Sequence, residues 1–203
     1  MNLKAQITAA KKFAEKWKGR GNEDQDMQLF WIDFIQNVLG VSNAGDLIDF
    51  QKKVRYNRHT TKIDAYIPNT RVLIEQKSFG VDLDKPEPRH GEMLTPFKQA
   101  EQYSQKLPLP EKARYIIVSN FETFRIHDMQ KEGFESNYEE IKLSDLPKEC
   151  HRLDFLIDQT KQVIQQEMEI SKQAGDIVGL LYDEFKKQYE TCDYLSKDEV
   201  HKN

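Results

Sequence analysis

Two segments near the N-terminus carry apolar residues every three or four positions, which is the spacing of helices with one buried face. They cover residues 3–18 and residues 23–39. Asn22 and Gln25 stand three positions apart, as in a capping box, and predict the start of the second helix. Gly40 is typical of a helix C-terminus, so the second helix is expected to end there.

Shorter apolar runs follow and predict β-strands. Three strands are expected over residues 48–56, 62–67 and 71–78, with residues 68–70 as the turn between the last two. Residues 72–74 form a continuous apolar run, which is expected of a strand that is covered on both faces.

The segment from Lys77 to Leu94 contains proline and glycine and is expected to be a loop. Thr95 then predicts a helix start. The remaining predicted elements are a helix from Pro96 to about Lys106, strands over residues 113–119 and 122–128, and a helical region over residues 153–190. This order predicts the α/β class, a mixed β-sheet flanked by helices with a C-terminal helical extension.

The composition indicates a soluble globular protein, with 38% hydrophobic and 32% charged residues among 203. No apolar run approaches the length of a membrane span, so no membrane partner is expected. The net charge of −4 argues against a protein that coats DNA with a uniformly basic surface. Cys150 and Cys192 have no paired spacing, which excludes a disulfide framework or zinc site and fits the cytoplasm.

One short segment has the opposite charge to the whole chain. Residues 51–62 contain no acid and five cations, Lys52, Lys53, Arg55, Arg58 and Lys62. The segment fits either a DNA-binding face or an ordinary solvated strand and turn.

The candidate chemistry lies on the predicted hairpin of residues 62–78. Because side chains alternate along a strand, Glu75 and Lys77 point to one side. An antiparallel partner strand places Asp64 across from the region of Glu75. Two carboxylates on facing positions of a hairpin repel each other unless a cation lies between them. Mg²⁺ or Mn²⁺ is a suitable cation, because it binds oxygen ligands. The hairpin therefore predicts a divalent-cation site with a lysine beside it.

This pattern of Asp64, ten residues, and then Glu75-x-Lys77 resembles the PD-(D/E)xK nuclease superfamily, with Ile63 in place of the proline of that name. The resemblance implies a restriction-endonuclease-like fold. It also implies that Asp64, Glu75 and the Gln76 carbonyl bind Mg²⁺, and that Lys77 positions or polarises the attacking water. DNA hydrolysis would then leave 5′-phosphate and 3′-hydroxyl ends.

Two further elements support the resemblance. Gln99 and Tyr103 share a helix face and resemble the Gln-x-x-x-Tyr motif of the RecB-like branch, where it helps orient DNA or the lysine. An ordinary amphipathic helix explains them equally well. Glu23, with Asp26 behind it, is expected to complete the metal site as in the superfamily, although acids also favour any helix N-terminus.

The order of four segments resembles the N-terminal part of MmeI-like (type IIL/IIG) restriction-modification proteins: GNEDQDMQLFWIDFIQNVLGV, KIDAYIPNTRVLIEQKS, FKQAEQYSQKLP and ARYIIVSNFETFRIHD. The resemblance implies a nuclease domain over residues 1–150. Residues 151–203 would begin a helical spacer to methyltransferase and target-recognition domains of the same parent chain. Expected partners are double-stranded DNA, those domains, and a second copy of the chain on DNA. No Asn-Pro-Pro-Tyr-like tetrapeptide occurs, so this chain is expected to be a fragment that does not methylate DNA.

Three other interpretations stay open. The first is a catalytically inactive nuclease-like scaffold of a DNA methyltransferase protein that binds DNA or partners. The second is an α/β interaction module whose acids form simple ion pairs. The third is a nuclease that acts on RNA or single strands. Metal binding separates the first two from the nuclease, and relative cleavage of DNA and RNA separates the third.

Overall fold

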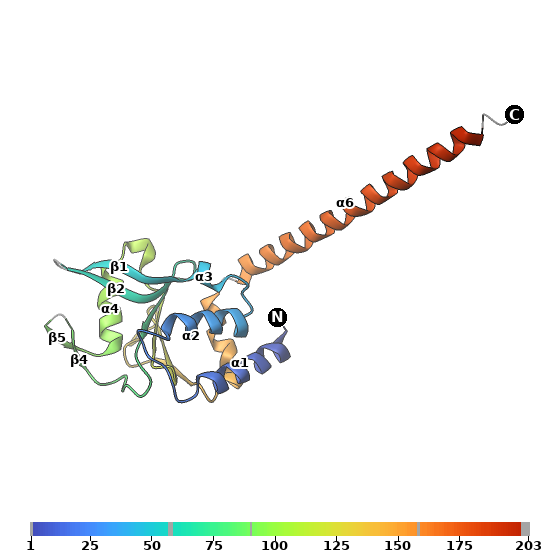
Figure 1. Ribbon diagram of the computed structural model, residues 1–203. Helices are drawn as coiled ribbons and strands as arrows, with labels where there is room; N and C mark the ends of the chain where they lie inside the picture. Colours follow the sequence, from blue (N-terminus) through green and yellow to red (C-terminus); the bar gives the residue numbers. More distant parts are fainter. Residues whose placement is uncertain (1, 57–58, 90, 158, 200–203) are drawn as a thin grey trace. The chain divides into compact units, whose positions relative to one another are not determined.

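The computed structural model describes residues 2–56, 59–89, 91–157 and 159–199. The chain forms two compact units, residues 1–158 and residues 159–203. The first unit holds a six-stranded sheet and the helices around it (Figure 1).

The six strands of this sheet follow the order β1-β2-β3-β6-β7-β8. Their bounds are Asp49–Tyr56 (β1), His59–Ile67 (β2), Val72–Gln76 (β3), Tyr115–Ser119 (β6), Thr123–Asp128 (β7) and Glu139–Lys142 (β8). β3 and β6 are parallel, and every other neighbouring pair is antiparallel. The sheet is therefore mixed, as the sequence predicted, and β3 lies in its interior.

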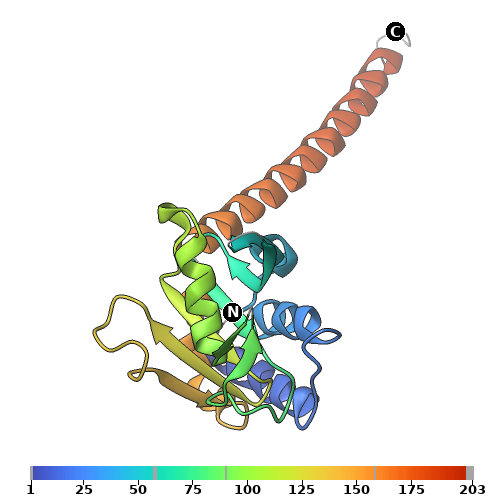
Figure 2. The same ribbon diagram turned by 90° about the vertical axis from the view of Figure 1, so that its left-hand side faces the viewer.

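Helices cover both faces of the sheet (Figures 1 and 2). One face packs against α1 (Leu3–Trp17), α2 (Met27–Asp33), a π-helical segment η1 (Phe34–Val38), α3 (Ala44–Leu47), α5 (Leu146–Glu149) and a 3₁₀ segment η3 (Cys150–Leu156). The other face packs against α4 (Pro96–Lys106), which is followed by a 3₁₀ turn η2 (Leu109–Glu111). All five residues of β3 are buried, as its apolar run predicted.

The predicted second helix is shorter than expected at its start. Residues 23–26 form a separate turn, in which Oδ1 of Asn22 accepts hydrogen bonds from the N–H groups of Asp24 and Gln25. In return, the carboxylate of Asp26 accepts a hydrogen bond from the backbone N–H of Asn22. The prediction that Asn22 caps the second helix was therefore wrong: Asn22 closes the turn before the helix, and α2 begins at Met27 with Asp26 at its N-cap position.

Several elements were not predicted from the sequence. The expected loop from Lys77 to Leu94 contains a two-stranded hairpin, β4 (Glu87–Arg89) and β5 (Glu92–Leu94). Strand β8 was not predicted either. Ile141 is its one buried residue, and an alternation of apolar and polar residues needs at least two apolar positions. In both cases the strands are too short and too exposed to carry a hydrophobic signal.

The second unit is the helix α6 (Gln159–Glu199). Its exposed apolar side chains include Ile170, Ile177, Leu181 and Phe185. Among the helices that the structure describes, none is both long enough and apolar enough to cross a membrane.

Candidate active site

The hairpin of β2 and β3 brings Asp64 to the end of β3. The register of the two strands pairs Ala65 with Ile74, so Asp64 would face Glu75 at the next position. There the Asp64 carboxylate accepts a hydrogen bond from the backbone N–H of Gln76, with 2.8 Å between nitrogen and oxygen. The charge of Asp64 acts on Glu75, so the two carboxylates lie within electrostatic reach of each other, as the hairpin geometry predicted.

Lys77 and Glu75 form an ion pair inside the protein. Their side chains are 3% and 1% exposed, and Nζ lies 2.7 Å from Oε1. Because Leu73 belongs to the core beneath α4, alternation places Glu75 on the α4 side of the sheet as well. Oε2 of Glu75 is buried and has no hydrogen-bond partner among the described residues. An unsatisfied buried oxygen costs free energy, and such costs are typical of functional sites.

Burial controls the proton affinity of this group. It raises the pKa of the Glu75 carboxyl to about 8, and the charge of Asp64 adds to the effect. Burial also raises the pKa of Asp64 to about 6, although the N–H of Gln76 favours the ionised form. Burial alone would lower the pKa of Lys77, but the Glu75 carboxylate outweighs it and the pKa is raised. Both carboxyls therefore take up protons more readily than free ones, and a bound cation would compete with those protons.

The side chain of Gln76 points to the opposite face of the sheet. Its Oε1 accepts a hydrogen bond from Nε1 of Trp31 at 2.9 Å, and its Nε2 donates to the carbonyl of Lys77 at 3.0 Å. This side chain is 1% exposed and is held in the core. Any ligand role of Gln76 therefore belongs to its main-chain carbonyl, as the resemblance implied.

Glu23 lies in the turn before α2 and contacts the segment after β3. Its carboxylate accepts a hydrogen bond from the N–H of Ser78 at 3.2 Å, and its own N–H donates to Oγ of Ser78 at 3.1 Å. The charge of Glu23 contributes to the raised pKa of Asp64, so it lies within electrostatic reach of the site. Asp26 instead accepts from the N–H of Asn22 and serves the helix start.

The two predicted side chains of α4 each hold a different hairpin. Oε1 of Gln99 accepts a hydrogen bond from Nε of Arg89, on β4, at 3.1 Å. The hydroxyl of Tyr103 accepts one from Oγ1 of Thr61, on β2, at 3.1 Å. Burial raises the pKa of Tyr103, and the charge of Glu75 adds to this. Tyr103 thus lies within electrostatic reach of Glu75 and Asp64, and the described bonds of the two side chains join α4 to β2 and β4.

Arg89 is a cation of this site that sequence reasoning missed. Its charge acts to lower the pKa values of Asp64 and Glu75 and opposes protonation of Lys77. No motif around Arg89 marks it, because its segment looks like a loop. Its position follows from the docking of β4 against α4, which only the folded chain reveals.

Three of the predicted DNA-binding cations share an exposed face of the β1–β2 hairpin. Lys53 pairs with Lys62 in the ladder, and Arg55 lies two positions along β1 on the same face. No ion pair of these three side chains is found in the described part of the chain. Like charges directly opposite each other are destabilising, so this face favours an anionic partner.

The other two predicted cations differ. Lys52 lies on the opposite face, with Nζ 2.6 Å from Oε2 of Glu111 and 4.3 Å from the centre of the Tyr66 ring. Lys52 is therefore engaged within the protein and is the weaker candidate for a DNA contact. Arg58 lies outside the described residues, so its role stays a prediction.

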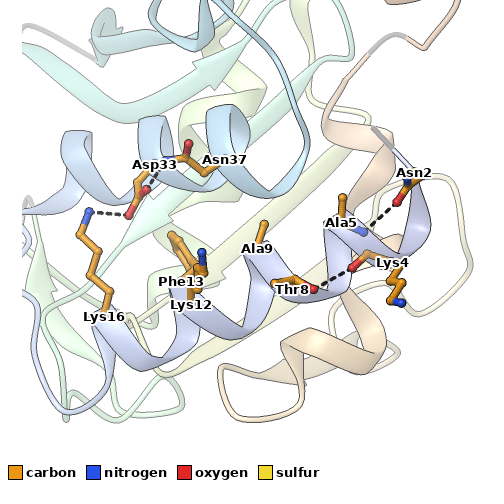
Figure 3. A pocket seen from close by; sticks show the side chains of 10 residues that line it. All are labelled: Asn2, Lys4, Ala5, Thr8, Ala9, Lys12, Phe13, Lys16, Asp33 and Asn37. Atoms are coloured by element: carbon orange, nitrogen blue, oxygen red, sulfur yellow. Dashed lines mark hydrogen bonds and ion pairs between the residues drawn. The ribbon is translucent and has the colours of Figure 1, made fainter.

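A cavity of about 620 Å³ opens elsewhere, between α1 and the α2–η1 segment (Figure 3). Asp33 is the one acid among the described residues that line it. Its carboxylate accepts hydrogen bonds from Lys16, Trp17 and Asn37, the first and last of which also line the cavity. This carboxylate is fully engaged, and the other charged side chains that line the cavity are lysines, so the candidate chemistry stays at Glu75.

The domain is thus a mixed α/β fold with two acids and a lysine gathered on one face of its sheet. A family model described as MmeI, N-terminal domain, matches residues 8–188. The chain belongs to this family, as its sequence resemblance predicted, and is a domain related to restriction-modification enzymes. Searches of the curated proteins and of the solved structures found no match.

Proposed function

We propose that this chain is a DNA endonuclease domain of a restriction-modification enzyme that hydrolyses phosphodiester bonds with a divalent cation. The buried Glu75 carboxylate carries the proposal, because it binds Lys77 through one oxygen, leaves the other unpartnered in the described chain, and has Asp64 nearby. Membership in the MmeI N-terminal family supports the link to restriction.

The residues at the site fit Mg²⁺ or Mn²⁺. In proteins Mg²⁺ is usually held by one or two carboxylates, and water fills the remaining positions. Within the described residues no three or more His, Cys, Asp or Glu side chains gather as a metal site. The ion would therefore be held by Asp64, Glu75, the main-chain carbonyl of Gln76, and water. When bound, it would offset charge on the phosphate and lower the pKa of a bound water.

The protein's own groups are arranged for this chemistry. The N–H of Gln76 fixes the Asp64 carboxylate, so little reorganisation is needed during the reaction. Lys77 holds a positive charge beside Glu75, where it can donate a hydrogen bond to the attacking water or to a phosphate oxygen. The burial of Glu75 strengthens every charge interaction at the site.

The exposed face of Lys53, Arg55 and Lys62 is the proposed contact for the DNA backbone. Cations at this face would neutralise phosphates and fix the position of the duplex without reading its sequence. Sequence recognition would then belong to a target-recognition domain of the parent chain, which would also carry the methyltransferase. Because one site cuts one strand, double-strand cleavage would use a second copy on DNA.

Cleavage of plasmid DNA in Mn²⁺ tests this function, with Lys77→Ala against the wild type. Lys112→Ala is the matched control, because Lys112 is an exposed lysine on the surface. We expect Lys77→Ala to cut at least about a hundredfold more slowly, since it removes the group that positions the attacking water. Equal rates for Lys77→Ala and the wild type would rule out this mechanism.

A scaffold function is the second candidate, and the burial of the site favours it. Glu75 and Lys77 are almost inaccessible, and each already has a partner in the other. A domain that only binds DNA or partners could keep such a pair for structural reasons. This candidate predicts that no divalent cation binds at Asp64.

A further inference from the structure

The β4–β5 hairpin lies against α4 (Figure 1). Each strand contributes one side-chain hydrogen bond to the helix. On β5, Oε2 of Glu92 accepts from Nε2 of Gln102 at 3.0 Å. On β4, Nε of Arg89 donates to Oε1 of Gln99 at 3.1 Å. Of these two hairpin residues, Arg89 is the one whose charge acts on Asp64 and Glu75.

The guanidinium of Arg89 is only partly engaged by these contacts. Its Nε donates a hydrogen bond to Gln99, and its Nη2 forms a longer ion pair with Oε2 of Glu87, at 3.3 Å. No hydrogen bond from Nη1 is found among the described residues, and the Arg89 side chain is 37% exposed. Because a guanidinium carries five N–H donors, several remain available to a ligand.

Arg89 also belongs electrostatically to the cleavage site. Its charge acts on Asp64, Glu75 and Lys77, so the guanidinium lies within reach of all three. Yet its described hydrogen bond at this end goes to the neutral amide of Gln99 and to neither site carboxylate. Its ion pair with Glu87 at 3.3 Å is partly exposed, and such pairs contribute little, so the guanidinium stays available to a stronger anionic partner.

A guanidinium in this position can bind an anionic group, such as a phosphate, that enters the site beside the two carboxylates. A divalent cation would satisfy the charges of Asp64 and Glu75, and the guanidinium would then face the bound phosphate. The planar fork of arginine matches the oxygens of a phosphate group, and charge-assisted bonds of this kind are about twice as strong as neutral ones.

We propose that Arg89 binds a non-bridging oxygen of the phosphate at the cleavage site, and that Gln99 is the positioning residue that aims it. This inference rests on the proposed nuclease function. It makes the β4–β5 hairpin a wall of the DNA-binding surface. It also assigns Gln99 a role through Arg89, whereas the family resemblance suggested a role on DNA or on Lys77.

The experiment measures two quantities on the same folded proteins. Binding of a short fluorescent DNA duplex is followed by anisotropy in Ca²⁺, and Mn²⁺ binding is followed by calorimetry. Arg89→Met is expected to bind DNA roughly tenfold or more weakly, and to reduce the slope of log affinity against log salt by about 0.9. Its Mn²⁺ binding is expected to be retained or tighter, because the carboxylates lose a competing cation. A merely structural role would weaken both.

Two further variants complete the test. Lys85→Met, which removes an exposed cation of the same segment, is expected to bind DNA like the wild type. Gln99→Met is expected to weaken DNA binding, but the double variant Arg89→Met/Gln99→Met should bind no more weakly than Arg89→Met alone. Additive losses in the double variant would contradict the positioning role of Gln99.

The outcomes separate this inference from the proposed function. Unchanged DNA binding by Arg89→Met would overturn the role of Arg89. A wild-type protein that binds Mn²⁺ but no DNA would overturn it as well, while it would leave the metal site in place. A wild-type protein that binds neither would overturn the nuclease proposal itself. Circular dichroism and thermal unfolding of each variant verify that loss of binding is not loss of fold.

Discussion

Nζ of Lys77 lies 2.7 Å from Oε1 of Glu75, and both side chains are almost completely buried at the end of an interior strand. Removing two charges from water is expensive, and apolar residues of similar size often replace such a pair without loss of stability. The pair is therefore weak evidence for stability, and its contribution to folding can be tested separately from the proposed chemistry.

Removal of one partner and of both partners should have opposite effects on stability. Lys77→Met leaves Glu75 buried without a partner, and we expect the free energy of unfolding to fall by about 3–5 kcal/mol. The double variant Glu75→Leu/Lys77→Met removes both polar groups and should be as stable as the wild type or more stable, by up to about 4 kcal/mol. Urea unfolding measures both. A double variant less stable than Lys77→Met would contradict this account.

The pH dependence of stability should identify Glu75. Its pKa is about 8 in the folded protein and near 4.5 when it is free, so between these values the folded state binds more protons than the unfolded state. The free energy of unfolding must then fall as pH rises through this window, by an amount on the order of a few kcal/mol. Asp64 acts in the same direction between 3.8 and about 6.

Urea unfolding at about pH 5, 6.5 and 8 measures this slope in the wild type and in Glu75→Gln. The buried His127, whose pKa is lowered by burial, contributes the opposite slope in acid but is present in both proteins. The difference between them therefore isolates Glu75, and we expect the variant to lose less stability toward pH 8. Parallel curves would show that Glu75 is not protonated in the folded state.

Much of the fold followed from local patterns. The continuous apolar run of β3 and the turn at residues 68–70 sufficed to predict the central hairpin. Thr95 and Pro96 likewise marked the start of α4, where Oγ1 of Thr95 accepts a hydrogen bond from the N–H of Lys98. Strand β8 carries one buried residue and three charged ones, so its place at the sheet edge follows from pairing with β7 and not from its own pattern.

The part of the candidate site that depends on local patterns was also predictable from the sequence. Strand alternation and hairpin register are local rules, and they placed Asp64, Glu75 and Lys77 together. The position of Arg89 follows instead from the packing of the short β4–β5 hairpin against Gln99, ten residues further along the chain, which no periodicity encodes. The distinction between Lys52 and Lys53 also required the fold, because Glu111, the partner of Lys52, is remote in sequence.

The hydrogen bond between Trp31 and Gln76 should stabilise the strand that carries Glu75. Trp31→Phe removes the N–H donor and leaves Oε1 of Gln76 without it in the core, with an expected loss of about 1–3 kcal/mol. Trp17→Phe is the control, because Asp33, the acceptor of its N–H, keeps two other donors. Urea unfolding should give a larger loss for Trp31→Phe, and the reverse order would contradict this role.

The exposed cations of the β1–β2 hairpin should determine the salt dependence of DNA binding. We expect Lys53→Gln/Lys62→Gln to reduce the slope of log affinity against log salt by about 1.8, since each contact contributes about 0.9. Lys52→Gln, on the opposite face and paired with Glu111, should leave the slope nearly unchanged. Fluorescence anisotropy across a salt series measures this. Equal slopes in all three proteins would place the DNA elsewhere.

The central claim is that the carboxylates of Asp64 and Glu75 bind a divalent cation, and Mn²⁺ titration by calorimetry tests it most directly. The comparison is between the wild type, Asp64→Ala, and the control Asp46→Ala, which removes an exposed acid of α3. Binding should release protons and tighten from about pH 6 to about pH 8, because the ligands must be deprotonated. We predict binding in the wild type and the control and its loss in Asp64→Ala. Equal heats in all three folded proteins would show that these acids form ion pairs only.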